Sequence, residues 1–163
     1  MSRDLNLSIP GAPNFKYIDF VKSDTAIRKG INNIPTEEQW KSIELLATKI
    51  LQPIRNKFGA IRITSGFRSV ELCEAVGSNS NSNHSRGEAA DIEPLDPKVK
   101  LIDIANFIVQ YLDFRELILE FFPDGWCHVA YRSDANIKEI KLKDDHHNYV
   151  RMTWEGVQKF YPV

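Results

Sequence analysis

Segments with helical periodicity and segments with strand character are grouped along this chain rather than alternating, and this grouping limits the folds open to it. Helical patterns cover residues 36–54 and 96–112, and most strand-type segments follow the second of them. The expected strands are 60–64, 116–120, 126–131, 138–143 and 149–154. Because segregated helices and strands do not make βαβ units, we predict an α+β fold with an antiparallel sheet flanked by helices.

The first helix has the clearest signals. Thr36 and Gln39 stand at the spacing of a capping box, in which each side chain binds a backbone N–H that the start of a helix leaves free. Pro53 is expected to kink the last turn, because proline has no N–H to donate. The apolar residues at helical spacing, which should face the core, are Trp40, Ile43, Ala47, Ile50, Leu51 and Ile54.

Shorter signals place other elements. Ser69 can cap a short helix that Gly77 ends, and residues 77–83 read as a polar loop. Asp96 and Pro97 stand in the order preferred at a helix start, so the second long helix should begin there. The Pro-Asp-Gly sequence at 123–125 predicts a turn that joins two strands as a hairpin.

Composition excludes several classes of partner. The 163 residues include 21 basic and 22 acidic side chains, for a formal charge of −1, whereas binding to nucleic acid or an anionic membrane needs a cationic surplus. No apolar run approaches the roughly 20 residues of a membrane span. Residues 1–10 lack the apolar segment of a signal peptide, and two cysteines make no disulfide framework. We expect a single domain over residues 1–163, made in the cytoplasm and acting as a monomer without nucleic acid or membrane insertion.

Two histidines and an aspartate carry the pattern of a metal site. His84 is followed seven positions later by Asp91, with Gly87 between them to allow a tight turn. A further histidine, His128, lies on an expected strand. Two histidines and one carboxylate leave a fourth position open, as a catalytic Zn²⁺ requires. Cys127 should point to the opposite face of its strand, so we expect it to be a buried apolar residue rather than a ligand.

Residues 82–91 follow the pattern S-x-H-x-x-G-x-A-x-D, and residues 126–128 follow W-x-H. Together with Ser-Gly-Phe-Arg-Ser at 65–69, these motifs resemble the M15 zinc peptidases, the group of D-Ala-D-Ala carboxypeptidases and bacteriophage endolysins with the hedgehog/DD-peptidase fold. The resemblance covers about residues 14–132. Residues 133–163 are expected to be a C-terminal extension of the same domain.

The resemblance implies a role for several residues. His84, Asp91 and His128 would be the ligands of Zn²⁺. Arg68 would polarise the scissile carbonyl and stabilise the developing oxyanion. The remaining implied residues, which would contact the substrate, are Ser82 and Trp126.

The general base is less directly indicated. The family places a glutamate shortly before the second ligand histidine, and two carboxylates of this chain precede His128. Glu120 lies eight residues before His128, and Asp124 lies four before it. We favour Glu120, since pairing across a hairpin can bring it beside His128. Asp124 is the alternative, although aspartate in a Pro-Asp-Gly turn commonly binds the backbone.

The implied activity is zinc-dependent hydrolysis of the peptidoglycan stem peptide, either as a D-Ala-D-Ala carboxypeptidase or as an L-Ala-D-Glu endopeptidase. The base would take a proton from water and return it to the leaving amine. The alternative is a non-catalytic, zinc-containing binding module of the same fold. Because the substrate lies outside the membrane and no signal peptide is expected, a phage or bacterial wall hydrolase fits best, either a lysis enzyme released through a separate pore or a virion-borne enzyme.

Overall fold

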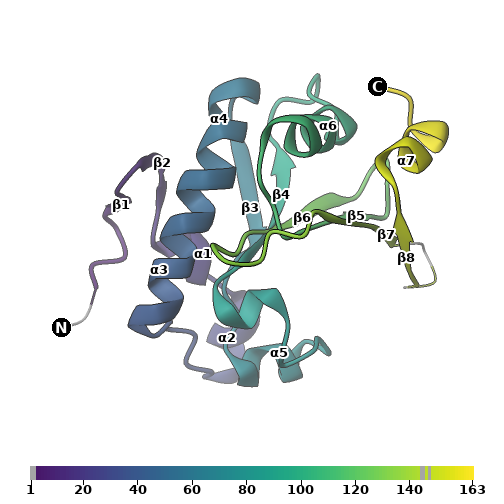
Figure 1. The fold of residues 1–163 in the computed structure, drawn as a ribbon. Coiled ribbons are helices and arrows are strands. Elements are labelled where there is room, and N and C mark those ends of the chain that lie inside the picture. The colour runs from purple at the N-terminus through teal and green to yellow at the C-terminus, as the bar shows by residue number, and fades with distance from the viewer. Residues whose placement is uncertain (1–2, 144–145, 147) are drawn as a thin grey trace.

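A six-stranded sheet forms the centre of the computed structural model, which describes residues 3–143, 146 and 148–163 (Figure 1). The strand order is β3-β4-β6-β5-β7-β8, and a separate hairpin pairs β1 with β2. The bounds of the strands are β1 Ser8–Ile9, β2 Ala12–Lys16, β3 Ile61–Ser65, β4 Ala89–Pro94, β5 Glu116–Glu120, β6 Trp126–Ala130, β7 Glu139–Lys143 and β8 Tyr149–Met152.

The α+β class is confirmed, and the sheet is mostly antiparallel, with one parallel pair, β5 and β7, that the sequence did not indicate. Strand β6 already pairs with β4 and β5 on its two edges, so the chain that leaves it joins the sheet elsewhere, and it does so at the outer edge of β5. The chain leaves β6 at Ala130, which is opposite Glu116, and enters β7 at Glu139, which is also opposite Glu116. Strands β5 and β7 therefore start at the same end of the sheet.

Helices cover the sheet and its ends. Their bounds are α1 Ile18–Val21, α2 Asp24–Lys29, α3 Glu37–Leu46, α4 Gln52–Phe58, α5 Val70–Ala75, α6 Leu101–Tyr111 and α7 Trp154–Phe160, with a π-helical segment η1 Ala47–Leu51 and a 3₁₀ turn η2 Asn83–Arg86. The capping box of Thr36 and Gln39 is present at the start of α3. The helix widens over η1, which contains Lys49, because Pro53 has no N–H to bind the Lys49 carbonyl.

The expected start of the second long helix was wrong. Helix α6 begins at Leu101 rather than at residue 96 or 97. The Asp96 side chain accepts a hydrogen bond from the N–H of Lys98, and its carbonyl accepts one from Val99. Asp96 therefore stabilises a local turn instead of capping a helix, and aspartate commonly serves either purpose.

The expected strand over 149–154 was also too long. Strand β8 ends at Met152, and Thr153 caps helix α7 by accepting a hydrogen bond from the N–H of Gly156. The helix cap provided by Thr153 therefore ends the strand earlier than the β-branched residues of 149–154 had suggested. Residues 144, 145 and 147, between β7 and β8 in the chain, lie outside the described residues.

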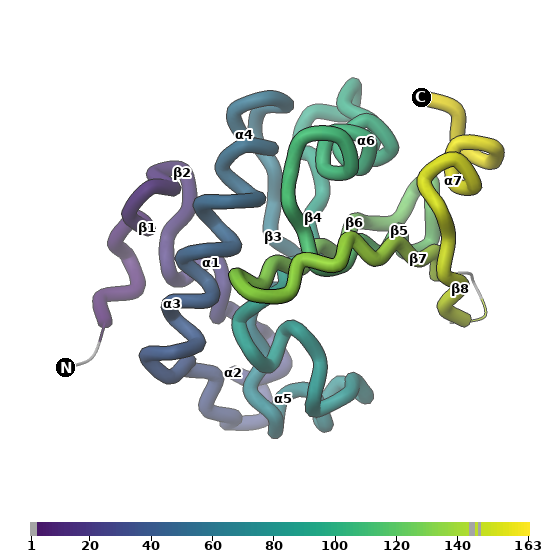
Figure 2. Tube along the Cα trace, in the orientation of Figure 1, coloured from purple at the N-terminus to yellow at the C-terminus, as the bar shows by residue number. Residues whose placement is uncertain are grey.

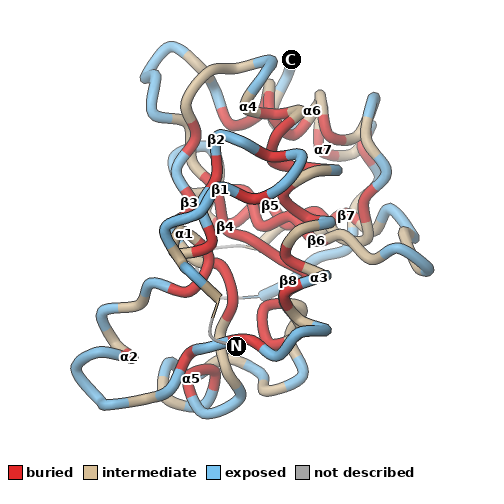
Figure 3. Tube along the Cα trace, turned by 90° about the vertical axis from the view of Figure 1, so that its left-hand side faces the viewer, coloured by how far each residue is buried: buried red, intermediate tan, exposed pale blue. Residues whose placement is uncertain are grey.

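The two faces of the sheet meet different surroundings, because side chains alternate along each strand. One face joins the hydrophobic core with α3, α4 and α6, and Figure 3 shows the central strands as buried. The residues of the central strands on this face are Ala90, Ile92, Leu117, Leu119, Cys127 and Val129. The intervening residues, on the opposite face, include Asp91, Glu116, Glu120 and His128. The helices therefore leave one polar face of the sheet available for a site.

Strands β7 and β8 extend the sheet beyond β5, at the edge opposite β3, and helix α7 follows β8 (Figure 2). Ile140, Trp154 and Val157 are buried in the core, and the Trp154 indole N–H donates to Asn106 of α6. In the part of the chain that the structure describes, none of the helices has the length and apolar character needed to span a membrane.

Candidate metal centre

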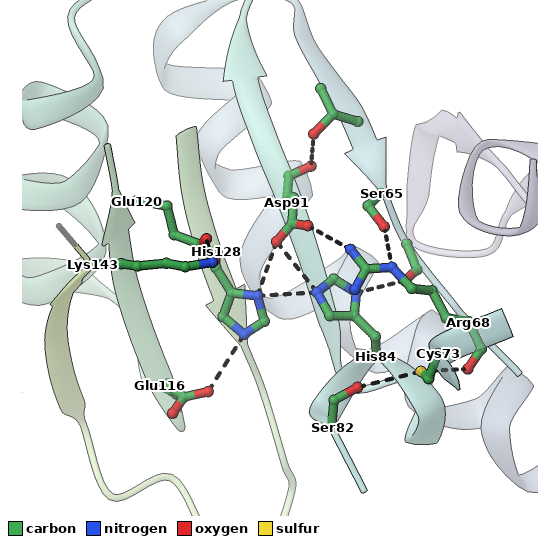
Figure 4. A network of polar contacts seen from close by, with 12 residues as sticks. Ser65, Arg68, Cys73, Ser82, His84, Asp91, Glu116, Glu120, His128 and Lys143 are labelled. Atoms are coloured by element: carbon green, nitrogen blue, oxygen red, sulfur yellow. Dashed lines mark hydrogen bonds and ion pairs between the residues drawn. The ribbon is translucent and has the colours of Figure 1, made fainter. Parts of the chain in front are cut away.

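Strand pairing brings Asp91 and His128 together. In the antiparallel pair β4–β6 these two residues stand directly opposite each other, so their side chains project from the same face of the sheet. The Nδ1 atom of His128 lies 2.9 Å from Oδ1 of Asp91 (Figure 4). Both side chains are buried. The sheet register thus sets two of the three expected ligands without help from a loop.

His84 reaches the same point from η2, just before β4. Its Nδ1–H donates to the carbonyl of Gly66 over 2.6 Å, which leaves Nε2 directed toward Asp91 and His128. A Cβ added to Gly66 would lie 2.6 Å from the carbonyl oxygen of Phe20, so only glycine allows the approach that holds this carbonyl in place. The orientation of His84 is therefore set by the backbone at the end of β3.

The three donor atoms have the spacing of a tetrahedral metal site. Nε2 of His84 lies 3.1 Å from Nδ1 of His128 and 3.3 Å from Oδ1 of Asp91. Zinc–ligand bonds of about 2.0–2.1 Å imply edges of about 3.3 Å between the ligands of a tetrahedron. Within the described residues, this is the group of histidine, cysteine and carboxylate side chains close enough to hold a metal ion. The residues present therefore fit the metal that their pattern implies.

Charge within the cluster shifts the pKa values of its members. Burial alone would raise the pKa of Asp91, but attraction to His84 and hydrogen bonds with His128 and His84 outweigh it, and the pKa falls well below its usual range. Burial would lower the pKa of His128, but its contacts with Asp91 and Glu116 outweigh burial and raise the pKa to about 9. Without metal, the cluster is held by a carboxylate and a protonated imidazole, and a metal ion would take the place of that proton.

Arg68 lies against the cluster. One guanidinium nitrogen lies 3.1 Å from Oδ2 of Asp91, and Nε donates to the hydroxyl of Ser65 over 2.8 Å. The side chain keeps 20% of its surface exposed, so it faces the cavity while its position is fixed. Ser82 lies at the edge of the same cavity, where its hydroxyl contacts the thiol of Cys73 at 3.7 Å.

A cavity of about 1140 Å³ opens above these residues. The loop 77–83, the polar face of β4, β5 and β6, and residues of β7 and β8 line it. Trp126 and Glu120 are among the lining residues, and the rings of Trp126 and Phe121 lie 5.2 Å apart. Asp124 instead lines a second cavity of about 600 Å³, on the side of Pro97. Of the two carboxylates considered as the base, Glu120 is the one that shares a cavity with the metal cluster.

Two carboxylates on β5, rather than one, flank His128. Ile118 is directly opposite His128, and Glu116 and Glu120 stand two residues to either side on the same strand face. Oε1 of Glu116 lies 3.4 Å from Nε2 of His128, and the pKa of Glu116 is lowered to about 2, because contacts with His128 and Lys141 outweigh burial. Glu116 was not predicted as a site residue from the sequence, although strand alternation from Glu120 places it on this face.

The fold and the site define a class of protein. A His₂Asp donor set on the floor of a large polar cavity, with an arginine and a glutamate beside it, belongs to a metal-dependent hydrolase. Residues 13–130 match the family described as Peptidase M15. Since the match spans more than half of the chain, the protein belongs to this metallopeptidase family, as the motifs suggested, and its mixed, mostly antiparallel sheet is compatible with the family's fold. The comparison with curated proteins gives no match.

Proposed function

We propose that the chain is a zinc-dependent peptidase that hydrolyses peptide bonds in the stem of peptidoglycan. The observation that supports this most directly is the triangle of donor atoms from His84, Asp91 and His128, spaced 2.9–3.3 Å apart. It lies on the floor of a cavity that Arg68 and Glu120 also line. Membership of Peptidase M15 supports the peptidase activity. Zinc and the substrate are the parts that the proposal adds.

Each residue has a distinct chemical task in this proposal. Zinc held by the three ligands would lower the pKa of a water molecule and polarise the scissile carbonyl. Glu120 accepts the proton of the attacking water and later donates it to the nitrogen of the leaving amine. Arg68 offers a fixed positive charge to the oxygen that becomes negative as the tetrahedral intermediate forms. Ser65 holds Arg68 for this role by accepting its Nε–H. Ser82 and Trp126 would contact the peptide.

Glu120 is the better base because of its position. It is buried on the polar face of β5, in the cavity that holds the metal cluster. Asp124 lines the other cavity, so a proton accepted there would have no direct route to the leaving group. If Glu120 is the base, Glu120→Gln, which keeps the size and removes the charge, should greatly lower turnover while the metal ligands remain.

Digestion of purified peptidoglycan, followed by mass spectrometry of the released fragments, tests the proposal. We expect fragments from the wild type, a turnover lower by about 10²–10⁴-fold in Glu120→Gln, and wild-type turnover in Asp124→Asn. Free D-alanine among the products identifies a carboxypeptidase, whereas a new N-terminal D-glutamate identifies an endopeptidase. A wild type that binds zinc stoichiometrically but releases no fragments would contradict the proposal and would instead identify a non-catalytic binding module.

A further inference from the structure

Strand β7 lies outside residues 13–130, which the family match covers, yet it forms part of the cavity wall. In the parallel pair β5–β7, Lys141 is opposite Ile118 and Lys143 is opposite Glu120. Because alternate side chains share a face, both lysines project from the face of the sheet that carries the metal cluster. This part of the chain, for which the sequence suggested no role, therefore delivers two cations to the site.

Each lysine contacts one of the two carboxylates that flank His128. Nζ of Lys143 lies 2.7 Å from Oε2 of Glu120 (Figure 4). Nζ of Lys141 lies 2.5 Å from Oε2 of Glu116. The side chains of Lys143 and Glu120 are only 15% and 9% exposed. These are charge-assisted hydrogen bonds shielded from bulk water, which fix side-chain geometry better than exposed ion pairs do.

The two lysines act at different points. Glu116 accepts a hydrogen bond from the Asn83 side chain at 2.8 Å, and its Oε1 lies at an ion-pair distance of 3.4 Å from Nε2 of His128. Lys141 therefore contacts the carboxylate beside the second ring nitrogen of a metal ligand, where partners of a ligand histidine usually lie. Lys143 contacts the expected base directly, and within the described part of the chain its other contacts are with the rings of Phe121 and Tyr149 rather than with a metal ligand. A substitution of Lys141 should change metal affinity, and a substitution of Lys143 should change the turnover rate.

Both ammonium groups are already engaged, which argues against a role in holding a substrate carboxylate. Lys141 also lies 3.1 Å from Oε2 of Glu139, and Lys143 lies over the rings of Phe121 and Tyr149. Partial burial would lower the pKa of each lysine, but hydrogen bonds to the neighbouring carboxylates outweigh it and the pKa values are raised. The lysines are therefore permanent charges with partners inside the protein.

We propose that Lys141 and Lys143 are positioning residues: Lys143 holds the carboxylate of Glu120 in place for proton transfer, and Lys141 holds Glu116 so that it orients His128 toward the metal. The inference rests on the proposed function for Lys143, whereas the Lys141 part concerns metal binding alone. In this proposal, strand β7 of the C-terminal extension contributes to catalysis and metal binding, although it lies outside the residues that the family match covers.

The experiment compares Lys141→Met and Lys143→Met with the matched control Lys138→Met. Lys138 also makes an ion pair, 3.1 Å from Asp113, but both side chains are at least half exposed and outside the cavity. Zinc affinity is measured by competition with a chelator, and kcat and KM are measured on purified peptidoglycan fragments. We expect Lys141→Met to weaken zinc affinity by about 10–100-fold. Lys143→Met should keep zinc affinity and KM, and lower kcat by about 10–100-fold.

Two further variants separate positioning from a general loss of packing. Lys143→Arg keeps the charge and should restore most of kcat. In a Glu120→Gln background, Lys143→Met should add almost nothing, because a residue that acts through Glu120 has no effect once that carboxylate is gone. Full additivity of the two changes, or wild-type kcat in Lys143→Met, would overturn the role of Lys143. Unchanged zinc affinity in Lys141→Met would overturn the role of Lys141. If the wild type hydrolyses nothing, the proposed function and the role of Lys143 fail together, while the zinc-affinity measurement still decides Lys141.

Discussion

In the metal-free protein, His128 should make the free energy of unfolding fall as the pH rises from 6 to 9. Burial works to lower the pKa of this histidine, but contacts with Asp91 and Glu116 raise it from 6.5 to about 9. A group whose pKa is higher in the folded state holds its proton more tightly there. Its contribution to stability is complete below pH 6.5 and is lost as the pH rises through 9.

The size of the effect follows from the shift. A rise from 6.5 to about 9, at about 1.4 kcal/mol for each pKa unit, gives about 3 kcal/mol of stability that is present at pH 6 and largely gone at pH 9. Glu116 does not disturb this window, because its pKa is lowered and its contribution is lost only in acid, between about pH 4.5 and 2. Asp91→Asn removes one of the two carboxylates that raise the pKa of His128, so it should roughly halve the loss.

Urea unfolding in the presence of a chelator, at pH 6 and pH 9, measures the effect. The wild type should lose about 3 kcal/mol between the two conditions, and Asp91→Asn about half of that. Asp134→Asn is the matched control, because the Asp134 side chain is 82% exposed and its ion pair is with Arg132 rather than with the cluster. This variant should lose as much stability between pH 6 and pH 9 as the wild type does. Equal losses in Asp91→Asn and the wild type, or a wild type whose stability does not change with pH, would refute the electrostatic reasoning.

Three further predictions concern the arginine, the metal and the turn after His84. Arg68→Ala should retain zinc, as metal analysis would show, but lower kcat/KM by about 10²–10³-fold, and a wild-type value would contradict its role. Zinc affinity measured by chelator competition should rise about tenfold per pH unit between pH 7 and 9, because zinc must displace the proton of His128. A zinc affinity that does not change with pH would mean that His128 is not a ligand. Gly87→Ala should lower the free energy of unfolding by about 3 kcal/mol, measured by thermal unfolding, because φ is +74° and a Cβ would lie 2.6 Å from the Gln39 carbonyl oxygen. Gly30 also has a positive φ, +65°, but a Cβ there would meet open space, so Gly30→Ala should cost only about 1 kcal/mol. Similar losses in the two variants would contradict the close approach at Gly87.

Local signals predicted the parts of the site that depend on neighbouring residues in the chain. The spacing of His84, Gly87 and Asp91 implied a tight turn between the two ligands, and the structure has a 3₁₀ turn, a glycine at positive φ and then β4. Alternation along β6 predicted that Cys127 would be buried away from His128, and the thiol is buried in the core. These features follow from backbone periodicity, which a sequence displays directly.

Features that depend on strand order were not accessible in the same way. No local pattern states that β7 will lie parallel to β5, so nothing in the sequence placed Lys143 beside Glu120. The register of β5 against β6, which makes Glu116 and Glu120 flank His128, is likewise a tertiary property. The helix α7 was missed for a different reason, since the Thr153 cap was readable but the preceding residues favoured a strand.

Activity as a function of added zinc tests the central claim most directly. The metal-free protein should release no fragments from peptidoglycan, and its activity should rise in proportion to zinc up to about one equivalent per chain, then stay constant. His128→Ala should gain no activity at any such ratio, because one of three ligands is missing. Hydrolysis by the metal-free protein, or full activity in His128→Ala, would contradict the account that His84, Asp91 and His128 hold a catalytic zinc ion.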